Sequence, residues 1–415
     1  MNKKLLENMA SLFTLKGAEY IISFITLPYL LRVLGPEKFG AIAFAQTIIT
    51  YGNLLVDYGF NLTAPRDIAK CNKEDIPKNF VAFYGAKFVL LVPILLIGTL
   101  LMAIFRNYLD IILMLCVLPS LIGNVIFPVW YFQGIQEMRF ITVFNLIART
   151  ISVIAIFAFV TVQSDYRLAA FLQSVTPIVA GVISLIVLYR KTPEIFSMPS
   201  WHDIKAKFKE GWDIFISTVF ISLYTNSNVF ILGIMTNDTV VGYYSAANKL
   251  IMAVNGLMGP ISSAIFPHIA ALYKESREKA IAFLHKTVRY IGGLSLLASL
   301  GTFILAEPIV HIIMGDSYEE SILILRILSF FPFVVALSNI FGVQTMVTFG
   351  MQNIFSRILM LSALFNFILI FPLIYFWEGI GLSITVMIVE SFVTITMYLI
   401  YVKMEFDCFD MIYNG

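Results

Sequence analysis

Residues 27–46 read LPYLLRVLGPEKFGAIAFAQ, and this stretch decides the fold. A long apolar segment runs into a short Leu-Gly-Pro turn at 34–36, and a second apolar segment follows at once, with Phe-Gly in its first turn. Gly35 can take a positive φ where a helix ends, and Pro36 suits the first turn of the next helix. Because both flanking segments are too long and too apolar for a soluble hairpin, we interpret them as two membrane-crossing helices joined by a tight external turn.

The composition extends this interpretation to the whole chain. The 415 residues are 59% hydrophobic and 13% charged, and the mean hydropathy is +0.86. A helix that crosses a bilayer needs about 20 mainly apolar residues, and such runs recur along nearly the full length. The sequence therefore predicts an all-α polytopic membrane protein. Residues 1–7 are polar and basic, and the apolar run after them is too long for a cleavable signal, so we expect the first helix to remain as an anchor.

About twelve transmembrane spans are expected, and the distribution of Lys and Arg orients them. Of the basic residues outside the middle of the spans, only Arg32, Lys38, Arg106 and Arg167 fall on the side opposite the N-terminus. Since basic residues accumulate on the cytoplasmic side, both termini are predicted to be cytoplasmic. The expected spans are 9–32, 38–63, 80–105, 108–133, 140–162, 166–189, 210–235, 239–271, 287–306, 320–348, 355–376 and 379–402.

The two halves of the chain resemble each other. A shift of 202 residues places Gly40 on Gly242 and Gln46 on Asn248, and the turn at 34–37 then falls on another short turn at 236–239. Six spans precede a basic stretch in the middle of the chain, so each half would have the same orientation and form a parallel repeat. The expected division is an N-terminal six-helix lobe at 1–191, a cytoplasmic linker at 192–209 and a C-terminal six-helix lobe at 210–415.

The sequence carries no motif of a catalytic site. It has no glycine-rich phosphate loop, no zinc-binding helix motif and no nucleophile elbow, and its three cysteines lack metal-ligand spacing. We therefore expect no enzyme activity, no metal and no cofactor. The formal net charge of +2 gives no reason to expect a nucleic-acid partner.

Charged residues inside the spans are the candidate site, because a charge in the bilayer is costly unless it is paired or faces a wet cavity. Lys16, Arg149 and Lys249 are candidate substrate-binding cations, with Asn145 and Asn248 beside the latter two. Lys16 also has a simpler interpretation, a local ion pair with Glu19 one turn later. A guanidinium such as that of Arg149 suits a phosphate group well.

The acidic residues inside the spans have two open interpretations. Asp57, Glu390 and Glu19 are candidates for ion coupling, because a buried carboxylate can carry a proton, and they could equally balance a buried cation. Two further cations have structural interpretations. Lys87 is expected to extend to the headgroups, and Arg326 to pair with Glu319 or Glu320.

Three motifs carry a resemblance to a known family: Leu-Gly-Pro-Glu-Lys-Phe-Gly at 34–40, Pro-Arg-Asp-Ile-Ala at 65–69 and Gln-Gly-Ile-Gln at 133–136. With the six-plus-six layout, the chain resembles polysaccharide-export flippases. These are the Wzx-type O-antigen translocases, which are related to the MATE exporters in the multidrug/oligosaccharidyl-lipid/polysaccharide superfamily.

The resemblance implies a MATE-like fold in the bacterial inner (plasma) membrane. It also implies movement of an undecaprenyl-pyrophosphate-linked oligosaccharide, such as an O-antigen repeat unit used for lipopolysaccharide, from the cytoplasmic to the periplasmic leaflet by alternating access. Coupling to H⁺ or Na⁺ is left open. The implied partners are the lipid-linked oligosaccharide, membrane lipids, and a glycan polymerase with its chain-length machinery.

Three other functions compete with the one that the resemblance implies. A MATE-type small-molecule exporter shares the fold but would be expected to have a more acidic cavity than Lys16, Arg149 and Lys249 suggest. A membrane enzyme would be expected to have a sizeable extramembrane domain. A flippase for the peptidoglycan lipid precursor would be expected to have more than twelve helices.

Overall fold

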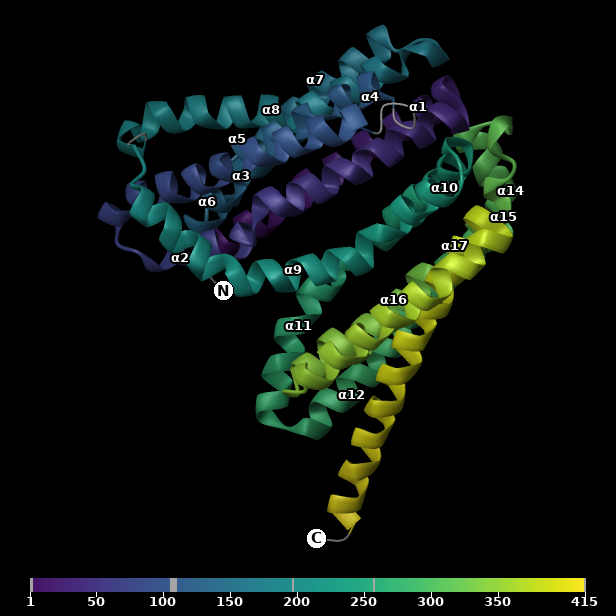
Figure 1. Ribbon diagram of the computed structural model, residues 1–415. Coiled ribbons are helices and arrows are strands. Elements are labelled where there is room, and N and C mark those ends of the chain that lie inside the picture. The colour runs from purple at the N-terminus through teal and green to yellow at the C-terminus, as the bar shows by residue number, and fades with distance from the viewer. Residues whose placement is uncertain (1–2, 105–109, 196–197, 257, 414–415) are drawn as a thin grey trace. The chain divides into compact units, whose positions relative to one another are not determined.

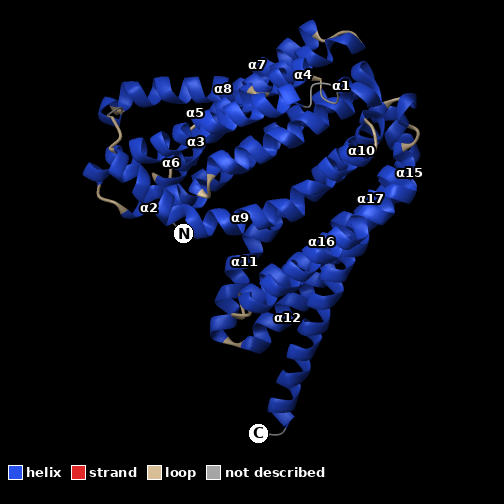
Figure 2. Ribbon diagram, in the orientation of Figure 1, coloured by secondary structure: helices blue, strands red, loops and turns tan. Residues whose placement is uncertain are grey.

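The structure is a computed structural model that describes residues 3–104, 110–195, 198–256 and 258–413. Every regular element in these ranges is a helix (Figure 2). Eight helical stretches are long and apolar enough to cross a membrane, and two of them, Phe24–Lys70 and Gln352–Lys403, have 47 and 52 residues. Because one crossing needs about 20 residues, each of these two supplies two crossings. These stretches give ten crossings, and the helices Trp201–Met235 and Asp238–Gly256 are long enough for two more. The predicted all-α membrane fold with about twelve spans is confirmed.

The chain forms two compact units, Met1–Phe230 and Ile231–Gly415, and each is described by itself. The sequence-based division into 1–191, 192–209 and 210–415 stays a prediction.

The first unit holds α1 to α8 and most of α9 (Figure 1). The span after α3 consists of three short helices, α4 to α6. Prolines lie at the two breaks between them, Pro119 at the start of α5 and Pro128 just before α6. The elements are α1 (Lys3–Asp57), α2 (Phe60–Lys70), η1 (Lys73–Asp75), α3 (Ile76–Ile104), α4 (Ile111–Val117), α5 (Pro119–Ile126), α6 (Val129–Gly134), α7 (Met138–Phe159), η2 (Gln163–Asp165), α8 (Tyr166–Lys191), η3 (Pro193–Ile195) and α9 (Trp201–Met235).

The second unit begins in the last turn of α9 and ends in the long α17. Three of its segments, η4, η5 and η7, have π-helical hydrogen bonding. The elements are α10 (Asp238–Gly256), α11 (Met258–Glu275), α12 (Arg277–Thr287), η4 (Val288–Gly292), α13 (Gly293–Ile304), α14 (Ala306–Ile309), η5 (Val310–Met314), η6 (Asp316–Tyr318), α15 (Ser321–Leu328), α16 (Phe331–Asn339), η7 (Ile340–Val347) and α17 (Gln352–Tyr413).

The turn at 34–36 is present as predicted. Helical hydrogen bonding is nearly continuous through α1, but Gly35 has a φ of 68° and a ψ of 172°, so α1 is two helices joined at a sharp kink. A residue with a side chain is strained at such a φ. In the second unit, α17 is divided in the same way at Glu378, which has a φ of 46° and a ψ of −123°. The expected turn at 236–239 also exists, since α9 ends at Met235 and α10 begins at Asp238.

The core of the first unit explains two of the sequence motifs. Large aromatic side chains from α2, α3 and α6 fill this core, among them Phe60, Phe83 and Trp130, each fully buried. The motif at 65–69 lies in α2 and packs against the motif at 133–136. A Cβ on Gly134 would lie 2.7 Å from the Cβ of Ile68. Gly134 is therefore the residue that lets α6 approach α2 closely.

Candidate functional site

An ion pair links the end of α1 to α3. α1 ends at Asp57, Tyr58 and Gly59 both have positive φ, and α2 begins at Phe60. The Nζ of Lys87 lies 2.7 Å from Oδ1 of Asp57, and the Lys87 side chain is only 2% exposed. The Nδ2 of Asn61, on α2, donates to the other oxygen of Asp57 at 2.9 Å.

This geometry corrects the expectation for Lys87, which does not extend to the headgroups. A buried ammonium is stable only beside a counter-charge, and the carboxylate of Asp57 supplies it from the neighbouring helix. Asp57 had two interpretations, ion coupling and balance of a buried cation, and the structure shows the second, since Asp57 pairs with Lys87. Whether Asp57 also couples an ion stays a prediction.

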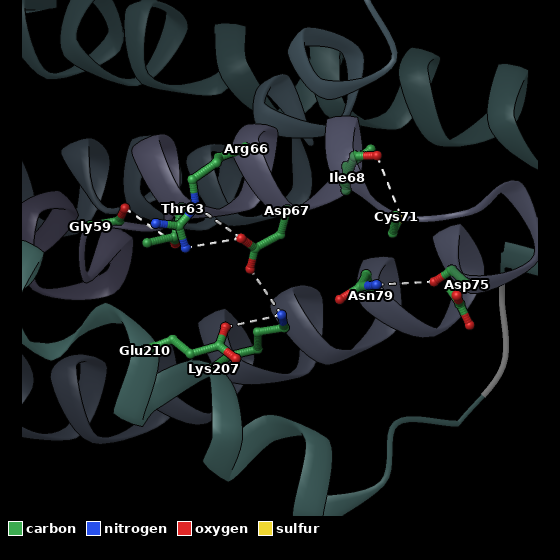
Figure 3. A network of polar contacts seen from close by, with 10 residues as sticks. All are labelled: Gly59, Thr63, Arg66, Asp67, Ile68, Cys71, Asp75, Asn79, Lys207 and Glu210. Atoms are coloured by element: carbon green, nitrogen blue, oxygen red, sulfur yellow. Dashed lines mark hydrogen bonds and ion pairs between the residues drawn. The ribbon is translucent and has the colours of Figure 1, made fainter.

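A second charged network fastens the start of α9 to α2 (Figure 3). The Nζ of Lys207 lies 3.0 Å from Asp67 and 3.2 Å from Glu210, and a nitrogen of Arg66 lies 3.0 Å from the other oxygen of Asp67. Lys207 also lies 4.6 Å above the ring centre of Phe83. A Cβ on Gly59 would lie 2.7 Å from Ile214, so the break after α1 packs against α9 as well.

Only part of this network could be expected from the sequence. Asp67 is the acid of the motif at 65–69, and Lys207 belongs to the basic stretch in the middle of the chain. Their pairing over 140 positions follows from the fold and could not be read from spacing. Lys78 lies 3.3 Å from Asp203, which adds a tie between the α3 region and α9.

Arg149 lies on α7 with an exposed side chain, and Asn145 lies one turn before it, half-buried. Five exposed apolar side chains of the same helix form one stripe: Val143, Ile147, Ile151, Ile154 and Phe157. At about 100° per residue, Arg149 falls on roughly the opposite side of α7 from this stripe. The cation therefore does not point along the apolar face of its helix.

Lys249 and Asn248 lie on α10, where Lys249 is exposed and Asn248 is half-buried. The residues on the same face one and two turns earlier, Ser245 and Gly242, are small and buried. Along this face, Lys249 is thus the first exposed residue after Gly242 and Ser245.

The other candidate site residues lie far apart in the sequence, Glu390 on α17 and both Lys16 and Glu19 on α1. Glu390 is half-buried on α17, and its carbonyl oxygen accepts a hydrogen bond from the Thr394 hydroxyl at 2.9 Å. The side chains of Lys16 and Glu19 lie outside the described residues. Arg326 is paired, but its partner is Glu307 in the first turn of α14, at 3.3 Å, and not Glu319 or Glu320.

Asp110 holds together the opposite end of the first unit. It caps α4 by accepting from the backbone N–H of Leu113, and it also accepts from the Tyr166 hydroxyl and from Arg167, whose Nη2 lies 3.1 Å away. Partial burial works to raise the pKa of Asp110, but these hydrogen bonds and the Arg167 charge outweigh it and lower the pKa below its usual value.

Comparison with solved structures defines the class of fold. The chain matches an inward-facing multidrug-resistance MATE transporter of the MOP superfamily with a TM-score of 0.70, at 14% identity, over 93% of this chain and 95% of that one. It matches the lipid II flippase MurJ in an inward closed conformation with a TM-score of 0.72, at 12% identity, over 96% of this chain and 87% of that one. The protein is a multi-pass membrane protein with the MATE and MurJ fold.

Sequence comparison then gives the family. The model for the family described as "Polysaccharide biosynthesis protein" matches residues 5–273. The chain is 35% identical over 403 residues to the "Putative O-antigen transporter" of Escherichia coli (strain K12), which covers 95% of this chain and 96% of that one. A Shigella dysenteriae protein of the same name is 30% identical over 94% of this chain and 98% of its own. The chain belongs to the polysaccharide biosynthesis protein family, as the motifs predict.

Proposed function

We propose that this protein is a flippase for a lipid-linked oligosaccharide, an O-antigen repeat unit or a related surface glycan. The observation that carries the proposal is the 35% identity, over nearly the full length of both chains, to a protein named as an O-antigen transporter. The fold is consistent with this function, because the lipid II flippase MurJ has the same architecture.

In this proposal the substrate hangs from undecaprenyl pyrophosphate and moves from the cytoplasmic to the periplasmic leaflet of the bacterial inner membrane. Two six-helix lobes provide alternating access to a site between the leaflets. The bias of Lys and Arg supports cytoplasmic termini. A transporter of this kind performs no bond-making chemistry, and its product would pass to a glycan polymerase and chain-length machinery.

Cations inside the spans would bind the pyrophosphate. Arg149 and Lys249 support this role because both are exposed and lie inside spans that the sequence predicts, where a charge commonly marks a substrate path. Lys16 is a third candidate from its sequence alone. Asn145 and Asn248 lie next to Arg149 and Lys249 and carry amide groups that can hydrogen-bond sugar hydroxyls.

Asp57, Glu390 and Glu19 are the candidates for coupling to H⁺ or Na⁺. Asp57 has the most developed geometry, because Lys87 and Asn61 occupy its two oxygens. Protonation of Asp57 would leave the buried ammonium of Lys87 without its counter-charge, so a proton on Asp57 would change the stability of this helix contact.

Deletion of the gene tests the proposed function directly. We expect surface glycan to disappear and lipid-linked glycan to accumulate at the cytoplasmic face, and a plasmid copy of the wild-type gene should restore both. An unchanged glycan profile together with new sensitivity to small toxic molecules would contradict the proposal. That result would favour the alternative, a MATE-type small-molecule exporter, which the similarity of fold allows.

A further inference from the structure

The first three turns of α9 lie outside the hydrocarbon region. α9 has 35 residues, so it is about 52 Å long, whereas a bilayer with its headgroups is about 40–45 Å thick. Residues 201–213 hold all the charged residues of this helix, and 214–235 hold only apolar and uncharged polar residues. The start of α9 therefore belongs to the headgroup zone or the adjacent water.

One face of this segment is fastened to the first unit. Lys207 is only 11% exposed and is neutralised by Asp67 and Glu210. Ile204 is buried in the aromatic core, and a Cβ on Gly211 would lie 3.2 Å from Tyr58. These contacts fix the rotation of the helix about its own axis, so they also fix which residues point away from the unit.

The neighbouring side of the helix carries four exposed residues at intervals of four, four and three: Trp201, Lys205, Lys209 and Trp212. The Trp212 ring also contacts Tyr58, with ring centres 6.4 Å apart. The two tryptophans are 60% and 52% exposed, and both lysines are exposed. At about 100° per residue the four fall within roughly 80° of one another. We call them the Trp–Lys stripe.

The lysines of the stripe differ from Lys207, their neighbour on the same helix. Lys207 has two acidic partners, whereas Lys205 and Lys209 have no ion pair with any described residue. Asp213 flanks the stripe one turn after Lys209 but does not pair with it. The stripe thus combines positive charge that the chain does not neutralise with the aromatic side chain that favours the membrane interface most.

We propose that the Trp–Lys stripe binds the headgroups of anionic phospholipids in the leaflet at this end of the first unit. The charges are complementary, each basic residue near an anionic surface adding about fivefold to binding. The tryptophans fit the apolar boundary below the phosphates, and the contacts of Lys207 hold the stripe in position. This inference concerns a lipid surface and does not depend on the proposed substrate.

The test uses the full-length protein in lipid nanodiscs, with Trp201 as the probe. Brominated phosphatidylglycerol and brominated phosphatidylcholine, each at the same mole fraction in a phosphatidylcholine background, quench tryptophan on contact. The signal of Trp201 is the part of the fluorescence that Trp201→Phe removes. We expect the phosphatidylglycerol to quench it several-fold more strongly than phosphatidylcholine, and Lys205→Gln/Lys209→Gln to abolish that preference.

The double variant Lys274→Gln/Lys286→Gln is the matched control, because it removes two exposed lysines from the second unit and should leave the Trp201 preference unchanged. Equal quenching by the two lipids in the wild type, or a preference that survives Lys205→Gln/Lys209→Gln, would overturn the proposal. So would protection of Trp201 by farnesyl pyrophosphate without any lipid preference, since the stripe would then face the path of a pyrophosphate substrate.

Discussion

At the scale of single residues, the pair of Asp57 and Lys87 shows what one sequence cannot predict. The expectation for Lys87 considered only its distance from the membrane surface. The structure supplies a counter-charge at the same depth from a residue 30 positions earlier. Pairing of this kind depends on the packing of two helices, which neither hydropathy nor spacing determines. The sequence did, however, single out Asp57 as an acid with a role inside the membrane.

Removing one member of this pair should be far more damaging than removing both. Asp57→Asn leaves the ammonium of Lys87 buried without a counter-charge and should reduce the free energy of unfolding by about 3 kcal/mol, whereas Asp57→Asn/Lys87→Met should be close to neutral. Thermal unfolding of the purified variants in detergent would measure both. A single variant as stable as the wild type would mean that the pair contributes nothing to the fold.

Asp110 makes stability depend on pH at low pH. Its folded-state pKa is lowered, so its ion pair stabilises the fold above the ordinary carboxyl pKa of about 3.9. This contribution is lost as the pH falls through the folded-state value. Asp110→Asn keeps a residue that can cap α4 but removes the charge. Because the side chains of Asp110 and Arg167 are 26% and 41% exposed, the loss at pH 7 should be at most about 1 kcal/mol.

The measurement is the melting temperature of the wild type and Asp110→Asn in detergent from pH 7 down to pH 3. The two curves should begin to approach each other as the pH falls below about 4 and should continue to do so down to pH 3. A difference that stays constant over the whole range would show that the charge of Asp110 is not what stabilises this end of the unit.

At the scale of elements, the sequence was most informative where the backbone itself is constrained. The Leu-Gly-Pro turn could be predicted because Gly35 and Pro36 are suited to a helix end and a helix start, and Gly35 does have a positive φ. The break after Asp57 could not, because Tyr58 takes a positive φ of 46° that its residue type does not favour. The ring of Tyr58, whose backbone has this positive φ, stacks on the ring of Phe215, with ring centres 4.4 Å apart.

Two glycines should respond differently to substitution by alanine, because Gly134 lies in the close contact between α2 and α6 and Gly98 has open space around it. Gly134→Ala would place a Cβ 2.7 Å from Ile68 and should lower the free energy of unfolding by about 1–3 kcal/mol. Gly98→Ala, in α3, meets nothing within 4 Å and should be neutral or stabilising by up to about 1 kcal/mol. Thermal unfolding of both variants in the same detergent checks this. Equal effects would mean that the motif at 133–136 does not owe its glycine to close packing.

At the scale of the whole molecule, composition and hydropathy predicted the fold class and the number of spans, because the bilayer imposes both. Similar short turns at 34–36 and 236–238 fit the expected parallel repeat. The functional site was less accessible to prediction. Arg149 and Lys249 belong to different compact units, and no spacing rule states whether two such cations act on one substrate.

The most direct test of the proposed function is transport by the purified protein in proteoliposomes. A fluorescent lipid-pyrophosphate-linked oligosaccharide is placed in the membrane, and its transfer between leaflets is followed with a reagent that cannot cross the bilayer. We predict transfer that depends on the protein, slowed at least tenfold (about 1.4 kcal/mol in the barrier) by Arg149→Ala and by Lys249→Ala but unaffected by Lys274→Ala. No protein-dependent transfer would contradict the proposed function, and wild-type rates in both variants would contradict the role of these cations.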